Sequence, residues 1–246
     1  MQLPQLSVGK GGSLTSTVGL GVLSTFFGCD YRSIEVSCLA GVGQSRYGCN
    51  QPITTKGENV KILVIQGSPD AGSYSHELAT AYADEARGAG HDVRTIDLAT
   101  EDFDPVLRYG YRQHMEDENA PKRYQEDVAW ADHLVFSFPI WWSAEPAILK
   151  GFLDRTLTPG FGYRYVDGKS QGLLKDKTAA LIVTSRAPSF IYRIFGGLIW
   201  RWKSMVLGFV GIRLTKSLML GRIEQDVDTP AYRAAFVETV RAYARG

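Results

Sequence analysis

Cysteine is scarce in this chain of 246 residues, and its three cysteines, Cys29, Cys38 and Cys49, all lie within the first fifty positions. The remaining residues therefore fold without a disulfide bond. The cysteines form no close C-x-x-C pair and the four histidines are scattered, so we predict no metal site. Scarce cysteine is typical of a reducing compartment, and we expect a cytoplasmic protein.

Long apolar runs and net charge are lacking as well. No run reaches the roughly 18 residues that a membrane-spanning helix needs, so we expect a soluble protein. Lysine and arginine total 27 against 26 acidic residues, and this balance argues against a nucleic-acid partner and against a strongly acidic electron carrier. The length is sufficient for one large core, or for one core with an appendage.

The first 58 residues differ in composition from the rest. Glycine, serine and threonine are frequent, charge is sparse, and no helical or strand period persists beyond residues 18–27. Lys10 ahead of this apolar run resembles a signal peptide, and Phe26 to Cys29 faintly resembles a lipidation box, but the residues for cleavage are poor. We therefore predict a disordered appendage, or an extension from a misplaced start codon, over residues 1–58 and a folded domain over residues 59–246.

From residue 60 onward, strand and helix signals alternate. Apolar runs predict five strands, at 60–65, 91–98, 133–138, 178–184 and 212–220. Apolar residues at helical spacing predict a helix that ends at residue 88 or 90, and further helices at 124–131, from 146, at 192–207 and at 230–244. This alternation is typical of an α/β fold with a doubly wound parallel sheet, for which we predict the strand order 2-1-3-4-5. Such sheets bind ligands beyond the carboxyl ends of their strands.

The loop after the first predicted strand, residues 67–75, is rich in glycine and serine. It lacks the G-x-G-x-x-G of a dinucleotide-binding loop and the Gly-Lys of a P-loop. A helix follows at once, and a helix N-terminus together with small and hydroxyl residues favours a bound phosphate group. Taken alone, the composition would equally suit an ordinary turn.

The segment Phe136 to Tyr165 joins a strand, an aromatic turn, a helix and an aromatic return loop. Pro139 ends the apolar strand, Trp141 and Trp142 follow, and Pro146 suits the first position of a helix with an apolar face. This arrangement predicts a cradle for a planar ring. The alternative is a corner in which the tryptophans serve only for packing.

Pro139, Trp142, Pro146 and the stretch Ala147 to Phe152 match the P-x-x-W turn and the P-A-I-L-K-G-[FW] helix of the flavodoxin-like NAD(P)H dehydrogenases. From Val60 onward the chain resembles this quinone reductase family, which includes bacterial drug-activity modulators and ancillary flavoproteins of potassium efflux. The resemblance implies a flavodoxin-like fold, FMN or FAD as cofactor, NAD(P)H as hydride donor, and a homodimer.

The resemblance also implies which residues form the site. Tyr192 would face the flavin and the substrate as the nearest matched proton donor, and Tyr163 and Tyr165 would line the substrate pocket of the neighbouring subunit. The phosphate loop, the tryptophan turn and the loop after the fourth strand would hold the flavin. The implied cofactor-binding residues are Ser68, Ser73, Tyr74, Ser75, Pro139, Ile140, Trp141, Trp142, Ser143, Thr184, Ser185, Arg186 and Ala187.

Two positions depart from the family pattern. Arg186 stands where the family usually has glycine, and Leu198 stands where some members have a histidine. Proton delivery by that histidine is therefore not available here. The Y-x-Y spacing of Tyr163 and Tyr165 would also suit an aromatic strand edge, because alternate residues of a strand share one face.

We therefore predict a flavin-dependent NAD(P)H:acceptor oxidoreductase, an NAD(P)H dehydrogenase (quinone), that passes two electrons to quinones or similar flat electrophiles in a ping-pong cycle. Two other classes remain open. A flavin-binding regulatory subunit of a membrane transporter would share the same motifs. A flavodoxin-type electron carrier would share the fold but would lack the P-A-I-L-K-G-F helix.

Overall fold

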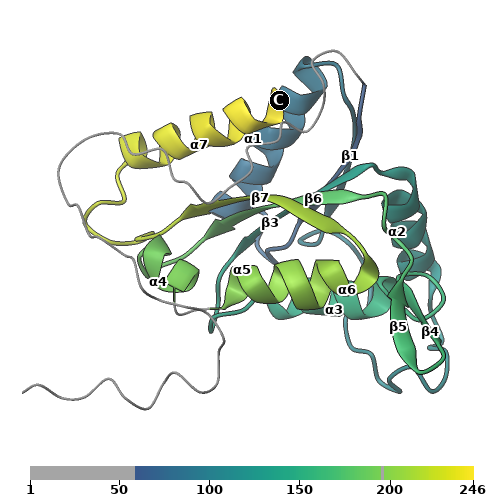
Figure 1. Ribbon diagram of the computed structural model, residues 1–246. Coiled ribbons are helices and arrows are strands. Elements are labelled where there is room, and N and C mark those ends of the chain that lie inside the picture. Colours follow the sequence, from purple (N-terminus) through teal and green to yellow (C-terminus); the bar gives the residue numbers. More distant parts are fainter. Residues whose placement is uncertain (1–58, 195–196) are drawn as a thin grey trace, which may run out of the picture. The chain divides into compact units, whose positions relative to one another are not determined.

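The computed structural model describes residues 59–194 and 197–246, so the prediction for residues 1–58 lies outside the described part. Its centre is a sheet of five parallel strands (Figure 1). In chain order these are β1 (Lys61–Gln66), β2 (Asp92–Asp97), β3 (His133–Pro139), β6 (Thr178–Thr184) and β7 (Arg213–Leu220). Their spatial order is β2-β1-β3-β6-β7. The predicted order 2-1-3-4-5 is confirmed, because β4 and β5 form a separate hairpin.

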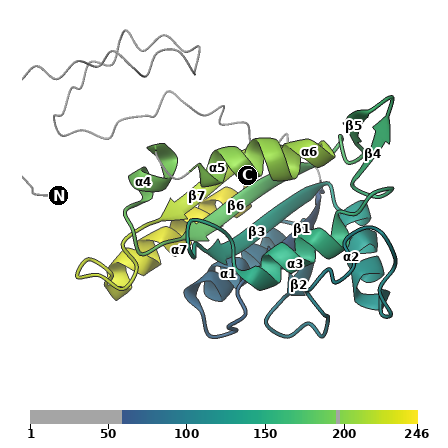
Figure 2. The ribbon, with the colours of Figure 1, turned by 90° about the horizontal axis from the view of Figure 1, so that it is seen from below.

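Helices cover both faces of this sheet (Figures 1 and 2). Alternate residues of β1 point to opposite faces, so Ile62 and Val64 join one apolar cluster while Leu63 and Ile65 join the other. All four are buried, which explains the unbroken apolar run in the sequence. One face carries α1 (Tyr74–Gly88) and α7 (Pro230–Ala244), and the other carries α2 (Asn119–Trp130), α3 (Ala147–Thr156) and the short helices between β6 and β7.

Side-chain caps fix the starts of the two long helices. Ser73 Oγ accepts a hydrogen bond from His76 N at 3.3 Å and begins α1. Thr229 caps α7 in the same way, with Pro230 in its first turn. The stripe predicted for α1 is buried under it, and consists of Leu78, Ala79, Tyr82, Ala83 and Ala86.

The single helix predicted over residues 192–207 is wrong. The segment instead forms α4 (Ser189–Ile194), α5 (Leu198–Arg201), the π-helix η1 (Trp202–Leu207) and α6 (Gly208–Val210). Gly197 precedes α5 with a φ of 61°, a left-handed conformation that interrupts a right-handed helix. Tyr192 therefore lies inside a short separate helix rather than at the start of a long one. No helix in residues 59–194 and 197–246 combines the length and apolar character needed to cross a membrane.

Other element boundaries differ slightly from the predictions. The second helix begins at Asn119 rather than Tyr124, because Pro121 can occupy a first helical turn. The strand β2 is one residue shorter at each end than predicted. Pro146 is the residue before α3, with a ψ of 150°, and not its first helical residue.

Gly151 of the P-A-I-L-K-G-F helix marks a close crossing of two segments. A Cβ atom at this position would lie 2.3 Å from Pro105 Cβ and 2.4 Å from the Pro105 carbonyl oxygen. The segment between β2 and α2 can therefore rest directly on α3 only because this residue is glycine.

The aromatic return loop contains a hairpin that the sequence analysis did not predict. Its strands are β4 (Tyr163–Val166) and β5 (Lys169–Gly172), which pair antiparallel. Asp167 and Gly168 form the two-residue turn with φ values of 51° and 74°. Asp-Gly is a preferred pair for such turns. The hairpin lies near the amino ends of the sheet strands (Figures 1 and 2).

Candidate active site

The loops after β1, β3 and β6 meet at one edge of the sheet, where these neighbouring strands end. The register aligns Pro139 of β3 with Thr184 of β6. Backbone hydrogen bonds extend this pairing, since Gly67 N donates to Ser137 O at 2.8 Å and Ile140 N donates to Thr184 O at 2.8 Å. The carboxyl edge therefore brings together the three loops that the sequence analysis singled out.

Internal hydrogen bonds shape the loop after β1. Asp70 N donates to Ser68 Oγ at 3.2 Å, and Gly72 N donates to Asp70 Oδ1 at 2.8 Å. Among the described residues, none accepts a hydrogen bond from the backbone N–H of Tyr74 or Ser75, the first two residues of α1. Two unpaired donors at the start of a 15-residue helix suit a phosphate group.

The side chains of Tyr74 and Ser75 point away from this loop. Ser75 Oγ is buried 3.2 Å from Thr184 Oγ1, a contact that joins α1 to the end of β6. The Tyr74 hydroxyl donates to Arg233 O at 2.7 Å, and burial raises the pKa of this phenol well above its ordinary value. These side chains fix the start of α1, so the backbone N–H groups are the donors that remain for a phosphate.

The tryptophan turn has an unusual backbone. Trp142 and Ser143 both have positive φ values, 50° and 60°, in a tight turn closed by 2.9 Å hydrogen bonds between the backbones of Trp141 and Ala144. Two consecutive left-handed residues other than glycine are uncommon, and such strain concentrates at functional sites. Trp142 is fully exposed and Trp141 is 48% exposed. Both rings are therefore accessible to a flat ligand.

Glu145 anchors this turn, and the sequence analysis missed it. Its buried carboxylate accepts a hydrogen bond from Trp202 Nε1 at 3.1 Å and forms an ion pair with Arg201. The Trp202 ring stacks on Phe138 of β3 with centroids 5.1 Å apart. The end of β3, the turn and the helices α5 and η1 are thus one packed unit. The sequence contained one signal for this role, which is an acidic residue within an otherwise apolar motif.

The loop after β6 is held by hydrogen bonds within the loop and to the segment after β7. Ser185 Oγ donates to Ala187 O at 2.7 Å, and Gln225 Nε2 donates to Arg186 O at 2.6 Å. The Arg186 guanidinium pairs with Glu224 at 3.1 Å, and both side chains are largely exposed. The structure therefore places this predicted cofactor residue in a surface ion pair beside the site.

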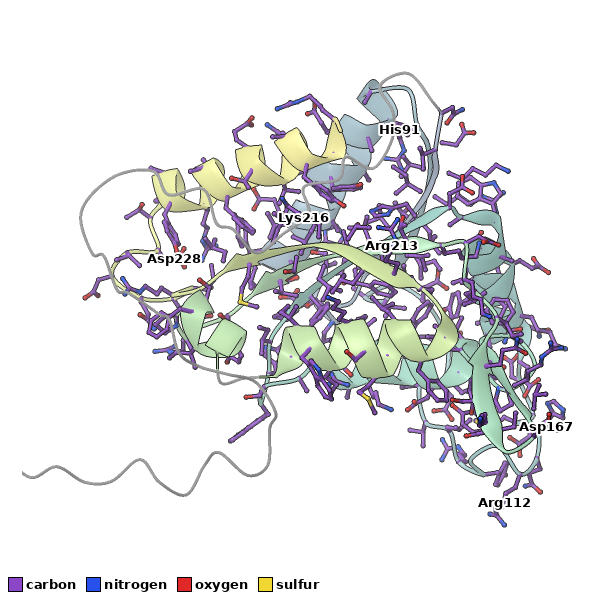
Figure 3. The ribbon with its side chains drawn as sticks, in the orientation of Figure 1. His91, Arg112, Asp167, Arg213, Lys216 and Asp228 are labelled. Atoms are coloured by element: carbon purple, nitrogen blue, oxygen red, sulfur yellow. The ribbon has the colours of Figure 1, made fainter. Side chains whose placement is uncertain are left out.

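The three predicted substrate tyrosines do not meet within one chain. Tyr192 lies half-buried in α4, near the carboxyl edge. Tyr163 and Tyr165 lie in the hairpin with ring centroids 5.8 Å apart, and Tyr163 packs on Phe209 at 4.8 Å. In Figure 3, Asp167 of the hairpin turn and Asp228, which follows β7, lie toward opposite ends of the sheet. Within one chain, the hairpin tyrosines therefore do not line the same site as Tyr192.

A cavity of about 440 Å³ lies away from the carboxyl edge. Segment 107–115 and the start of α2 form most of its lining, which includes none of the predicted site residues. We place the candidate site at the carboxyl edge because unpaired donors and accessible aromatic rings converge there.

Comparisons with known proteins agree with this architecture. A family described as having a flavodoxin-like fold matches residues 60–244. A Haemophilus influenzae protein named as an uncharacterized NAD(P)H oxidoreductase is 32% identical over 138 residues, which cover 54% of this chain and 68% of that protein. The human ribosyldihydronicotinamide dehydrogenase (quinone) is 27% identical over 183 residues, covering 63% of this chain and 78% of the human protein.

Solved structures give the same result. Smu.1420 from Streptococcus mutans UA159 is 32% identical with a TM-score of 0.61, and the match covers 75% of this chain and 98% of that one. The NAD(P)H:quinone oxidoreductase from Methanothermobacter marburgensis shares the fold with a TM-score of 0.66 at 23% identity, over 77% of this chain and 99% of that one. The chain therefore belongs to the flavodoxin-like family, among relatives named NAD(P)H oxidoreductases and NAD(P)H dehydrogenases (quinone).

Proposed function

We propose that this protein is a flavin-dependent NAD(P)H dehydrogenase (quinone) that passes two electrons to quinones or similar flat electrophiles. The names of its relatives support this reaction class. One observation carries the proposal. The unpaired N–H groups of Tyr74 and Ser75 lie at the same sheet edge as the exposed rings of the tryptophan turn. A flavin nucleotide consists of a phosphate and a planar ring, and this edge has a matching feature for each.

The residues at this edge fit a flavin. The start of α1 would bind its phosphate, the strained turn would orient its ring, and Trp141 and Trp142 would exclude water from one side. When bound, the flavin would supply the hydride chemistry. The protein would hold donor and acceptor in turn at the same slot, as a ping-pong order requires. Tyr192 would hold the proton that the reduced acceptor needs, since Leu198 has no titratable group.

A second copy of the chain would complete the acceptor pocket. Tyr163 and Tyr165 lie in the hairpin near the amino ends of the sheet strands, whereas their own tryptophan turn follows the carboxyl end of β3 (Figures 1 and 2). Tyr165 is 67% exposed and therefore able to contact another subunit. A homodimer would place the hairpin of one chain over the site of the other.

The test is an absorption spectrum of the purified full-length protein, followed by identification of any flavin released on denaturation. We expect a yellow protein whose flavin absorbance is lost with NADH or NADPH under anaerobic conditions and returns when a quinone is added. Protein that stays colourless and binds neither FMN nor FAD would refute the proposal. A flavin that bleaches and recovers only through a stable one-electron form would instead indicate an electron carrier.

A further inference from the structure

One stretch of the chain differs from the rest in charge. The segment from residue 177 to residue 223 contains no aspartate or glutamate, so all 26 acidic residues of the chain lie outside it. The net charge of the whole chain is only +1, yet this segment alone contains eight basic residues, so the remaining residues are net negative. The eight are Lys177, Arg186, Arg193, Arg201, Lys203, Arg213, Lys216 and Arg222.

The same segment exposes large apolar side chains. It includes α4, α5 and η1, where Trp200 is 64% exposed, Met205 is 58% exposed and Phe190 is 53% exposed. The helices α4 and α5 contact each other and lie side by side in both views (Figures 1 and 2). We call the exposed side chains of Phe190, Ile191, Trp200, Lys203 and Met205 the α4–η1 surface. The function proposed above assigns no role to any of them.

The run of α5 and η1 is amphipathic in an uncommon way. Trp202 and Leu207 are buried against the sheet, whereas Trp200, Lys203 and Met205 are exposed. A helix on the surface of a globular protein ordinarily presents polar residues to water. Tryptophan and other large apolar side chains next to lysine are typical of segments that lie in the interfacial layer of a membrane.

Lys203 is the cation on this surface that the fold leaves available. Arg201 pairs with Glu145 and Arg186 pairs with Glu224, both acids from outside the segment. Lys203 forms no ion pair with any residue in the described part of the chain. An anionic partner could therefore approach Lys203 without first breaking a contact.

Charge distinguishes two occupants of the surface, an anionic lipid bilayer and a second copy of the chain. In a twofold dimer the same patch of both copies meets, so the basic residues would oppose one another, and residues 177–223 contain no acid to pair with them. Anionic lipid head groups neutralise such cations, and exposed tryptophan and methionine side chains can enter the layer beneath. We infer that the α4–η1 surface docks this protein on an anionic lipid bilayer, without crossing it.

This surface borders the candidate site. Tyr192 lies in α4 directly after Ile191, and Arg201 of α5 pairs with Glu145 of the tryptophan turn. Docking would therefore hold the carboxyl edge beside the bilayer, where quinones with apolar tails dissolve. Only this consequence, an acceptor taken from the bilayer, rests on the proposed function.

The experiment measures cosedimentation of the full-length protein with vesicles of phosphatidylcholine alone, or of phosphatidylcholine and phosphatidylglycerol in equal parts. Lys203→Glu reverses the charge of the surface, and Lys122→Glu makes the same change on the exposed side of α2 as the matched control. Trp200→Ser removes the largest exposed ring, and Val106→Ser removes an apolar side chain that is 53% exposed elsewhere. All four positions are exposed, so folding should be retained, which urea unfolding checks.

We expect the wild type and both controls to bind the anionic vesicles, less at high salt, and to bind phosphatidylcholine weakly. Lys203→Glu and Trp200→Ser should bind the anionic vesicles about tenfold more weakly. Turnover of a water-soluble quinone should be the same in all five proteins, whereas the two surface variants should have a higher KM for a quinone held in anionic vesicles.

Binding to anionic vesicles that is absent, or equal in all five proteins, would overturn the inference. Light scattering tests the other occupant. If Lys203→Glu and Trp200→Ser are monomers where the wild type is a dimer, and their vesicle binding is unchanged, a second copy covers this surface and the inference is wrong. Vesicle binding in the expected pattern by a protein that binds no flavin would support docking and refute the proposed function.

Discussion

The two ends of the central sheet differ in how their polar groups are satisfied. At the carboxyl end, the N–H groups of Tyr74 and Ser75 have no acceptor among the described residues, and the tryptophan turn carries two left-handed residues. At the amino end, His133 Nδ1 lies 2.7 Å from Thr178 Oγ1 and Lys177 Nζ donates to Ala129 O at 2.8 Å. The same strands thus end in an accessible, strained edge and in a closed, paired one.

This difference is the reason why we place the candidate ligand site at the carboxyl end of the sheet. Unpaired donors and strained turns are unfavourable in an isolated protein, and they persist only where surrounding packing holds them. The paired amino end and the buried Glu145 anchor supply that packing. Changes at the amino end should therefore affect mainly stability, whereas changes at the carboxyl end should affect ligand binding as well as stability.

Acid should affect the amino end most strongly. Burial lowers the pKa of His133 from 6.5 to about 3. The folded protein then binds fewer protons than the unfolded chain between about pH 6.5 and pH 3, so the free energy of unfolding falls as the pH drops through this window. We expect a total loss of up to about 5 kcal/mol from this residue, measured by urea unfolding at several pH values.

Two histidine variants separate this effect from general acid denaturation. His133→Gln should lose the part of the pH dependence that comes from this histidine and keep the part that comes from carboxyl groups, whereas His114→Gln, which changes an exposed histidine, should keep the full wild-type dependence. Equal pH dependence in wild type and His133→Gln would contradict the assignment.

Removal of the Glu145 carboxylate should release the tryptophan turn. Glu145→Ala leaves Trp202 Nε1 and the Arg201 guanidinium without their acceptor, and breaking a buried pair costs about 3 kcal/mol. Flavin retention should fall as well, because the turn loses its anchor. Glu145→Gln keeps the hydrogen bond to Trp202 and should lose less stability in the same urea titration. If Glu145→Ala and Glu145→Gln have the same free energy of unfolding as the wild type, contacts other than those of Glu145 hold the turn.

Loss of the Tyr192 hydroxyl should slow only the step that needs a proton. We expect Tyr192→Phe to lower the rate of the acceptor half-reaction by about 10²-fold, the lower end for general acid help, because water can partly replace the phenol. Reduction by NAD(P)H should be unchanged in anaerobic stopped-flow traces. Tyr109→Phe removes a hydroxyl that pairs with Glu116 and serves as the control. An unaltered acceptor step would make Tyr192 a packing residue.

Relief of backbone strain should stabilise the carboxyl end slightly. Ser143 has a φ of 60°, which glycine adopts without steric cost. Ser143→Gly should therefore raise the free energy of unfolding by up to about 1 kcal/mol, reduced by the entropy that glycine adds to the unfolded chain. Ser143→Val should lower it, since a β-branched side chain resists this conformation. A stabilising valine would show that the turn is not strained.

The surface ion pair beside the site should matter least for stability. Arg186 and Glu224 are both largely exposed, and pairs of this kind contribute about 0–1 kcal/mol. Arg186→Ala should leave thermal unfolding almost unchanged. If Arg186 also stabilises the negative charge of a reduced flavin, the variant should be reduced more slowly by NAD(P)H, while Glu224→Ala should not. Unchanged reduction would limit Arg186 to its ion pair.

Periodic segments of this chain could be predicted from sequence, because the spacing of their apolar residues alone indicates which side chains are buried. The unbroken run in β1 and the stripe of α1 identify their elements without knowledge of any neighbour. The break before α5 was missed although two glycines stand in the sequence, because the apolar spacing continues across them. The hairpin was missed although Asp167 and Gly168 are a typical turn pair.

Residues of the site that depend on distant partners could not be predicted in this way. Glu145 pairs with Arg201 and Trp202, which lie 56 and 57 positions later in the chain. The motif identified the loops of the candidate site, whereas the groups that support these loops come from the tertiary fold.

The glycine of the P-A-I-L-K-G-F helix has a consequence for protein engineering. Because Pro105 rests on Gly151, even alanine at position 151 would push the overlying segment off α3. Libraries that redesign the cofactor site should therefore leave this codon fixed, although it contacts no predicted ligand. Substitutions beyond the crossing are constrained as well, because the Tyr111 hydroxyl donates to Asp154 O and the Arg155 guanidinium donates to Asp117 O, and both hydrogen bonds tie the overlying segment to α3.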